Sequence, residues 1–131
     1  MTLQNMALIA AGAIGATTAV IHGVLIERLM VRPFDAISAG DRRISAVTRR
    51  LISPLLHYST VSWLLSGLVL IAAALCPFDP GARLAIGLMV AGHYLFGAIG
   101  NAWATRGRHP GWMLMALAVG LIAFALYGPA A

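Results

Sequence analysis

Four long apolar stretches, separated by short polar ones, dominate the chain. They cover residues 6–26, 55–75, 84–104 and 112–127. A helix of about 20 apolar residues crosses the hydrocarbon core of a bilayer, and the fourth stretch is short for this purpose. The pattern predicts an all-α fold: a four-helix transmembrane bundle with up-down-up-down topology, forming a single domain over residues 1–131.

The connections between the last three stretches are short and contain helix breakers. Two prolines and a glycine follow Cys76, and Gly107 and Pro110 separate the third stretch from the fourth. Such residues do not continue a helix, so consecutive helices should be antiparallel. Gly107 is also the position where a positive φ is expected. Cys76 is the single cysteine of the chain, which rules out an internal disulfide.

The first connection is longer and basic, with six arginines and two aspartates between Arg28 and Arg50. Its second half carries apolar residues at helical spacing, namely Ile44, Val47, Leu51 and Ile52. One interpretation is a short amphipathic helix that lies on the membrane surface. The other is that the second long helix simply begins early, with Pro54 as a kink. The sequence leaves both open.

Composition and charge agree with a membrane protein. The chain is 60% hydrophobic and 10% charged, whereas soluble domains are about 25% charged. The net charge of +5 comes from arginines, and eight of the nine lie in the first and third connections. The positive-inside rule therefore predicts that both termini lie outside the cytoplasm. The charge is not a signal for nucleic acid. Residues 1–5 contain no basic residue, so the first stretch is expected to be a retained helix rather than a signal peptide.

Five polar residues lie in or at the edge of the apolar stretches: His22, Glu27, His57, His93 and Asn101. Polar groups in a membrane are costly and usually face the interior of a bundle. The helical rise puts three of them, His22, His57 and Asn101, about 7–10 Å from the nearest connecting arginine, so they should approach one another. Gly15, Ala19 and Gly23 form a stripe of small residues that should face a neighbouring helix.

These residues admit several kinds of chemistry. In one interpretation the histidines only hydrogen-bond across helices, and in another His22 and His57 ligate a transition metal or a b-type haem. No zinc-binding spacing motif and no catalytic constellation is present. A basic group, consisting of Arg28, Arg32, Arg106, Arg108 and His109, is expected to meet anions or lipid headgroups. We also expect Glu27 to be neutralised by Arg106 or Arg108.

Three short motifs resemble those of one protein family. They are His22 to Arg28, Leu56 to Thr60 preceded by Arg50, and Thr105 to Trp112. The chain resembles an uncharacterised family of small four-helix inner-membrane proteins, mostly proteobacterial. The resemblance implies the fold and a bacterial inner-membrane location, and it brings no assigned activity.

The sequence thus favours a small multi-pass protein of the bacterial inner membrane without enzymatic activity. It would act as an accessory subunit, a scaffold or a lipid-interacting protein with a cytoplasmic-side cluster of His, Arg and Glu. Two alternatives stay open: a haem- or metal-binding redox protein, and the protomer of a small dimeric transporter. Membrane lipids are the expected partners, together with a homo-oligomer or a larger membrane complex, and a nucleic acid is not expected.

Overall fold

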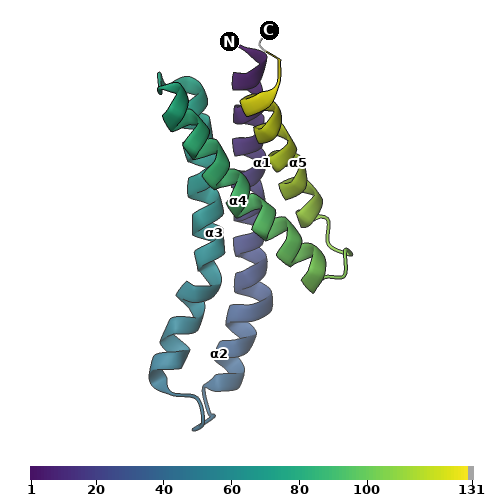
Figure 1. Ribbon diagram of the computed structural model, residues 1–131. Coiled ribbons are helices and arrows are strands. Elements are labelled where there is room, and N and C mark those ends of the chain that lie inside the picture. The colour runs from purple at the N-terminus through teal and green to yellow at the C-terminus, as the bar shows by residue number, and fades with distance from the viewer. Residues whose placement is uncertain (130–131) are drawn as a thin grey trace.

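The computed structural model describes residues 1–129, and they form a small all-helical bundle (Figure 1). Its elements are α1 (Leu3–Ile26), the π-helical turn η1 (Glu27–Val31), α2 (Arg32–Ser38), α3 (Ala46–Leu75), α4 (Pro80–Ala104) and α5 (Gly111–Tyr127). The first three join into one continuous helix, Leu3–Ser38. This helix, α3 and α4 are long enough and apolar enough to span a membrane, while α5 is shorter. These are the properties of a polytopic membrane protein.

The continuous first helix, α3, α4 and α5 run alternately up and down, and the two ends of the chain lie together at one end of the bundle (Figure 1). Helix α1 packs against both α3 and α5, and α4 packs chiefly against α5. Helix α4 is inclined, so its first turns lie beside α3 and its last turns lie far from it (Figure 1). The bundle is therefore closed at one end and splayed at the other, and α2 with the start of α3 projects beyond the α4–α5 turn.

Small residues allow the closest helix contacts in the closed half. A Cβ atom added to Gly12 of α1 would lie 2.5 Å from the carbonyl oxygen of Gly67 of α3, and a Cβ on Gly67 would lie 2.5 Å from that of Gly12. The two backbones thus touch where no side chain would fit. Close approach at small residues is a general source of helix association in membranes.

The predicted stripe of small residues is confirmed. A Cβ on Gly15 would collide with the hydroxyl of Tyr94 on α4, and a Cβ on Gly23 would lie 2.7 Å from Thr60 of α3. Between them, Ala19 is fully buried. The stripe faces neighbouring helices of the same chain. Tyr94 is itself fully buried, and its hydroxyl donates a hydrogen bond to the carbonyl of Trp63 at 3.3 Å.

Of the two interpretations left open for the first connection, the structure shows the second, in which the long helix begins early. Helix α3 begins at Ala46 and includes Pro54. Its start is fixed by Ser45, whose Oγ accepts from the backbone N–H of Thr48 at 3.0 Å. The guanidinium of Arg49 donates to the carbonyl of Ser38 at 3.0 Å, which ties α3 to the end of α2. The N-cap and the Arg49 hydrogen bond together hold the first turns of α3 beside α2, as one arm of a helical hairpin.

The other arm of the hairpin is α2, which continues α1 through the π-helical turn η1. The backbone N–H of Arg32 donates to the carbonyl of Glu27, five residues earlier, in a π turn. Pro33 follows at once, and its ring would clash with a carbonyl of a regular α-helix. We attribute the wider turn to this ring. The π turn also brings the side chains of Glu27 and Arg32 to one side of the helix.

The α4–α5 turn is built by two residues with positive φ. Gly107 has φ of 73°, as its sequence position predicts, and Arg106 has φ of 50°, which the sequence did not indicate. The N–H of Gly107 donates to the carbonyl of Ala102 at 2.8 Å and closes the end of α4. The indole of Trp112 donates to the carbonyl of Gly107 at 3.2 Å. The turn is therefore a tight corner, as expected.

Candidate functional site

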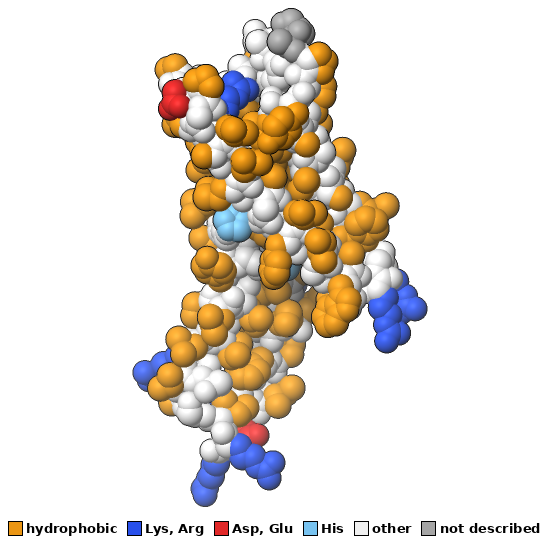
Figure 2. Space-filling model, in the orientation of Figure 1, with side chains coloured by type: hydrophobic (Ala, Val, Ile, Leu, Met, Phe, Trp, Pro, Cys, Tyr) orange, Lys and Arg blue, Asp and Glu red, His pale blue; other side chains and the backbone are white. Residues whose placement is uncertain are grey.

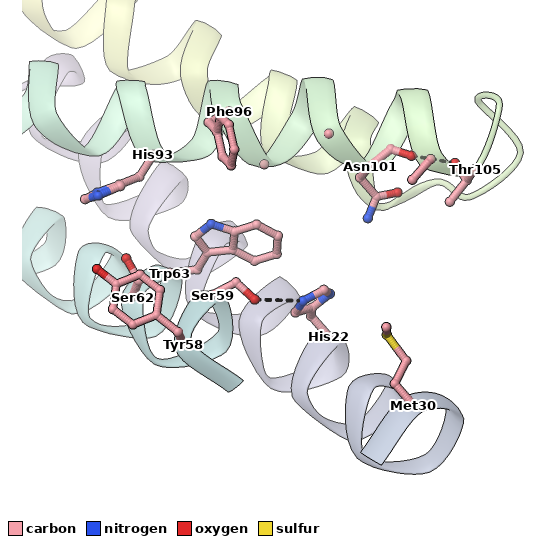
Figure 3. Close-up of a pocket in the computed structure, with 13 residues that line it drawn as sticks. His22, Met30, Tyr58, Ser59, Ser62, Trp63, His93, Phe96, Asn101 and Thr105 are labelled. Atoms are coloured by element: carbon pink, nitrogen blue, oxygen red, sulfur yellow. Dashed lines mark hydrogen bonds between the residues drawn. The ribbon is translucent and has the colours of Figure 1, made fainter. Parts of the chain in front are cut away.

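The splayed half of the bundle contains an open groove of about 460 Å³ between α1, α3 and α4 (Figure 3). Its lining is His22 and Met30 from the first helix; Tyr58, Ser59, Ser62 and Trp63 from α3; and His93, Phe96, Gly97, Gly100, Asn101, Ala104 and Thr105 from α4. The surrounding flank is largely hydrophobic, with histidine visible among apolar side chains (Figure 2). The groove therefore opens sideways, onto a surface suited to lipid.

Two glycines give the groove its shape. A Cβ on Gly97 would collide with the indole of Trp63, so α4 and this ring meet only because Gly97 has no side chain. A Cβ on Gly100, one turn further, would meet nothing within 4 Å. Gly97 thus makes room for the indole, which lies in the middle of the groove between His93 and Asn101 (Figure 3), and Gly100 leaves open space next to Asn101.

His22 presents a defined pattern of hydrogen-bonding groups. Its Nε2 lies 3.1 Å from the Oγ of Ser59, and Ser59 donates its single hydroxyl proton to the carbonyl of Leu56 at 3.3 Å. When this hydroxyl donates to Leu56, His22 donates through Nε2 and Nδ1 accepts; in the other tautomer Nε2 accepts from Ser59 and Nδ1 donates. The imidazole is also held against the indole of Trp63, with ring centroids 4.7 Å apart at 45°. The ring orientation is therefore fixed from two sides.

Asn101 faces His22 across the groove (Figure 3). The hydroxyl of Thr105 donates to its backbone carbonyl at 2.7 Å, but within residues 1–129 its side-chain Oδ1 is buried without a partner. His22 and Asn101 also line a smaller chamber of about 160 Å³ behind the groove, together with His109. His109 accepts from the N–H of Gly111 through Nδ1 at 3.1 Å. The amide of Asn101 thus lies between two spaces with hydrogen-bonding capacity unused.

The groove lining contains no Asp, Glu, Lys or Arg. Its polar groups are imidazole, hydroxyl and amide, set in otherwise apolar surroundings. Sites of this kind bind largely apolar molecules and orient them through a few hydrogen bonds. A charged headgroup would enter without a counter-charge, which is unfavourable in low-dielectric surroundings.

Glu27 lies in a different pocket and does not have the partner that we expected. Its carboxylate accepts from the Nε of Arg32 at 3.2 Å and lies 3.3 Å from the Nε2 of His57. The predicted pairing with Arg106 or Arg108 is therefore wrong. The physical reason is the π turn, which supplies Arg32 from the same helix, and the splay that carries the α4–α5 turn away.

The structure accordingly separates the sequence-predicted residues into groups. His22, His93 and Asn101 share the groove, whereas His57 shares a second pocket with Glu27, Arg28 and Arg32. The remaining basic residues, Arg106 and Arg108, are exposed on the α4–α5 turn, and His109 lines the small chamber.

Tyr58 and Phe96 also line the groove, and the sequence alone did not single them out. Tyr58 lies four residues before Ser62, and Ser59 lies three before it, spacings that bring these side chains toward one side of α3; Phe96 lies three residues after His93 on α4. This spacing indicates which residues share one face of a helix. It does not indicate which faces of α3 and α4 meet at the groove.

The donor set does not fit a haem or a metal. The Nε2 atoms of His22 and His57 are both engaged, by Ser59 and Glu27, and the two rings line different pockets. In the described part of the chain, no group of three or more His, Cys, Asp or Glu side chains is placed to hold a metal ion. We derive no redox or metal chemistry from these residues.

Comparison with known proteins identifies no relative. The chain matches no protein-family model, no curated protein and no solved structure. The resemblance of the three motifs thus reduces to a general class, a small all-helical protein with three long apolar helices.

Proposed function

We propose that this protein binds an uncharged amphiphile of the membrane in the lateral groove, without transforming it. The ligand class is a molecule with an apolar chain and a small neutral head that carries hydroxyl, carbonyl or amide groups. The proposal rests on the groove itself, which is open to the side, largely apolar and free of Asp, Glu, Lys and Arg.

The hydrogen-bonding groups support a head of this type. His22 offers its ring nitrogen Nδ1, Asn101 of α4 offers its amide N–H groups, and Ser62 of α3 offers a hydroxyl. A neutral head with both a donor and an acceptor would satisfy them, and its chain would lie along Phe96 and Trp63. Anionic and cationic lipids would be disfavoured, because no charge in the lining compensates theirs.

The setting of this proposal is the bacterial inner membrane, with both termini outside the cytoplasm. Eight of nine arginines lie in the first and third connections, which supports this orientation. The groove then opens toward the cytoplasmic leaflet. We favour binding by an accessory protein or scaffold over catalysis, because the one hydroxyl–imidazole pair of the lining, Ser59 with His22 at 3.1 Å, has no carboxylate in the lining to orient the imidazole.

Gly100 provides the variant that tests the proposal. Leucine at this position enters open space in the groove and should occupy the ligand volume without disturbing the fold. Gly92→Leu is the matched control, because Gly92 lies on the same helix, also has nothing within 4 Å of an added Cβ, and does not line the groove.

The measurement is native mass spectrometry of protein extracted from membranes in mild detergent. We expect a bound neutral lipid on the wild type and on Gly92→Leu, and its loss from Gly100→Leu. Equal lipid retention by the two leucine variants would contradict the proposal, as would a phosphate-bearing species that is present on Gly92→Leu and lost from Gly100→Leu.

A further inference from the structure

A second pocket lies away from the groove, at the π turn. It measures about 440 Å³ and is lined by Val20, Gly23 and Val24 of α1, by the charged residues of the turn, and by His57 and Thr60 of α3. Unlike the groove, it combines an apolar wall with charges. The pocket is independent of the proposed function, since it shares no lining residue with the groove.

The charges in this pocket favour an anion. Arg28 and Arg32 carry two positive charges against the single negative charge of Glu27. Glu27 engages Arg32 through Nε, which leaves the two terminal amino groups of that guanidinium available. The side chain of Arg32 is 71% exposed, so these groups reach the mouth of the pocket. Phosphate oxygens are the usual partners of such guanidinium groups.

The inner wall of the pocket carries Thr60 of α3, whose Oγ1 is buried without a hydrogen-bond partner in the described part of the chain. Because this oxygen has almost no accessible surface, the contacts that favour a ligand are those of the arginines and of the apolar wall. The π turn that assembles the site is itself a deviation that often occurs at functional sites.

The apolar wall decides between a lipid and a free anion. Val20 and Val24 continue from the charged end toward the middle of the first helix, one turn apart along one face. An acyl chain would lie against them while its headgroup stays with the arginines. A free phosphate would make no use of this wall.

We propose that this pocket binds one anionic phospholipid, with its phosphate held by Arg28 and Arg32 and one acyl chain along Val20 and Val24. The carboxylate of Glu27, which also contacts His57, competes with the phosphate for Arg32 and weakens the site by its negative charge. Phosphate is the shared chemistry of a lipid headgroup and of a free anion, and the wall selects the lipid.

The test is the rise in melting temperature when phosphatidylglycerol is added to the full-length protein in uncharged detergent. Arg32→Gln and Arg28→Gln should each weaken the lipid dependence about tenfold in concentration. Arg42→Gln, at the exposed end of the hairpin, removes the same charge and should leave the lipid dependence unchanged.

Glu27→Gln separates binding from stability. It breaks the same ion pair as Arg32→Gln, so a merely structural role predicts the same change in both. The proposal predicts opposite changes, with tighter phosphatidylglycerol binding in Glu27→Gln. The proposal would be overturned if Glu27→Gln and Arg32→Gln both weakened phosphatidylglycerol binding. It would also be overturned if Arg42→Gln weakened binding as much as Arg32→Gln does.

Two further additions identify the source of the phosphate. Phosphatidylcholine with the same chains should give a smaller rise than phosphatidylglycerol, and inorganic phosphate or glycerol phosphate should give none at equal concentration. A full rise from inorganic phosphate would overturn the assignment to a lipid.

Discussion

The indole of Trp63 lies directly against the backbone of Gly97, in the place where any other residue would have a side chain. This contact joins α3 to the middle of α4 just before α4 leaves the bundle. The buried Tyr94 lies on the core side of this contact, and the groove extends along the ring from His93 to Asn101 (Figure 3). The pair therefore lies at the boundary between the packed core and the candidate site.

Gly97→Ala should disturb this boundary. The added methyl group collides with a large ring that is held in place by His22 and by its own burial. Overpacking of this kind costs about 1–3 kcal/mol. We expect a lower melting temperature in detergent and a loss of the bound lipid. Gly92→Ala, on the same helix but in open space, should behave as the wild type, and equal melting temperatures for the two variants would show that the ring moves freely.

Gly15→Leu should be more damaging, because its side chain would have to displace the fully buried Tyr94. The expected result is a large drop in melting temperature. Gly120→Leu, on an exposed face of α5, adds the same side chain where nothing lies within 4 Å and should change little. Adding Tyr94→Ala to Gly15→Leu should restore part of the loss by making room. No rescue would mean that the two residues do not compete for the same space.

The contact between Glu27 and His57 links the first helix to α3. Single changes to glutamine at either position should lower the melting temperature, and the double variant should lose less than the sum, because both remove one interaction. The control is Arg106→Gln combined with Glu27→Gln, which should be additive since the two residues are unpaired with each other. Coupling with Arg106 instead of His57 would contradict the arrangement described here.

The orientation of the chain is a separate prediction from the arginine distribution. A reporter fused after Ala131 should be active outside the cytoplasm, and one inserted at Gly40, in the hairpin turn, should be active inside it. Gly40 suits an insertion because it lies exposed between α2 and α3. A cytoplasmic C-terminus would reverse the membrane leaflet onto which the groove opens.

Much of the fold follows from local sequence patterns. The apolar stretches predict the helices, and Gly107 predicts the corner between α4 and α5. The short fourth helix is also recovered, beginning at Gly111 where we expected Trp112. Long-range geometry is less accessible. The contact of Gly12 with Gly67 depends on the relative rotation of α1 and α3, which neither stretch encodes by itself.

The candidate site could be predicted from the sequence only in part, because its residues come from different helices. Depth along each helix was estimated from the helical rise, and it placed His22 and Asn101 correctly in one space. Depth does not give direction around the helix axis, so His57 was assigned to their group although it faces Glu27. The π turn was not predicted, and it is this turn that gives Glu27 its partner Arg32 within the same helix. The inclination of α4, which opens the groove, leaves no local mark in the sequence.

Trp63 offers the most direct measurement of the central claim, because its indole lines the groove. In a variant that keeps Trp63 alone, with Trp103→Phe and Trp112→Phe, a long-chain alcohol brominated near its head should quench the fluorescence in a saturable manner. Gly92→Leu in this background should retain the saturation, and Gly100→Leu should abolish it. A fatty acid of equal length, brominated at the same position, is ionised to the carboxylate and should quench Trp63 only weakly at the same concentration. The account would be contradicted by quenching that rises linearly with the alcohol and is equal in both leucine variants.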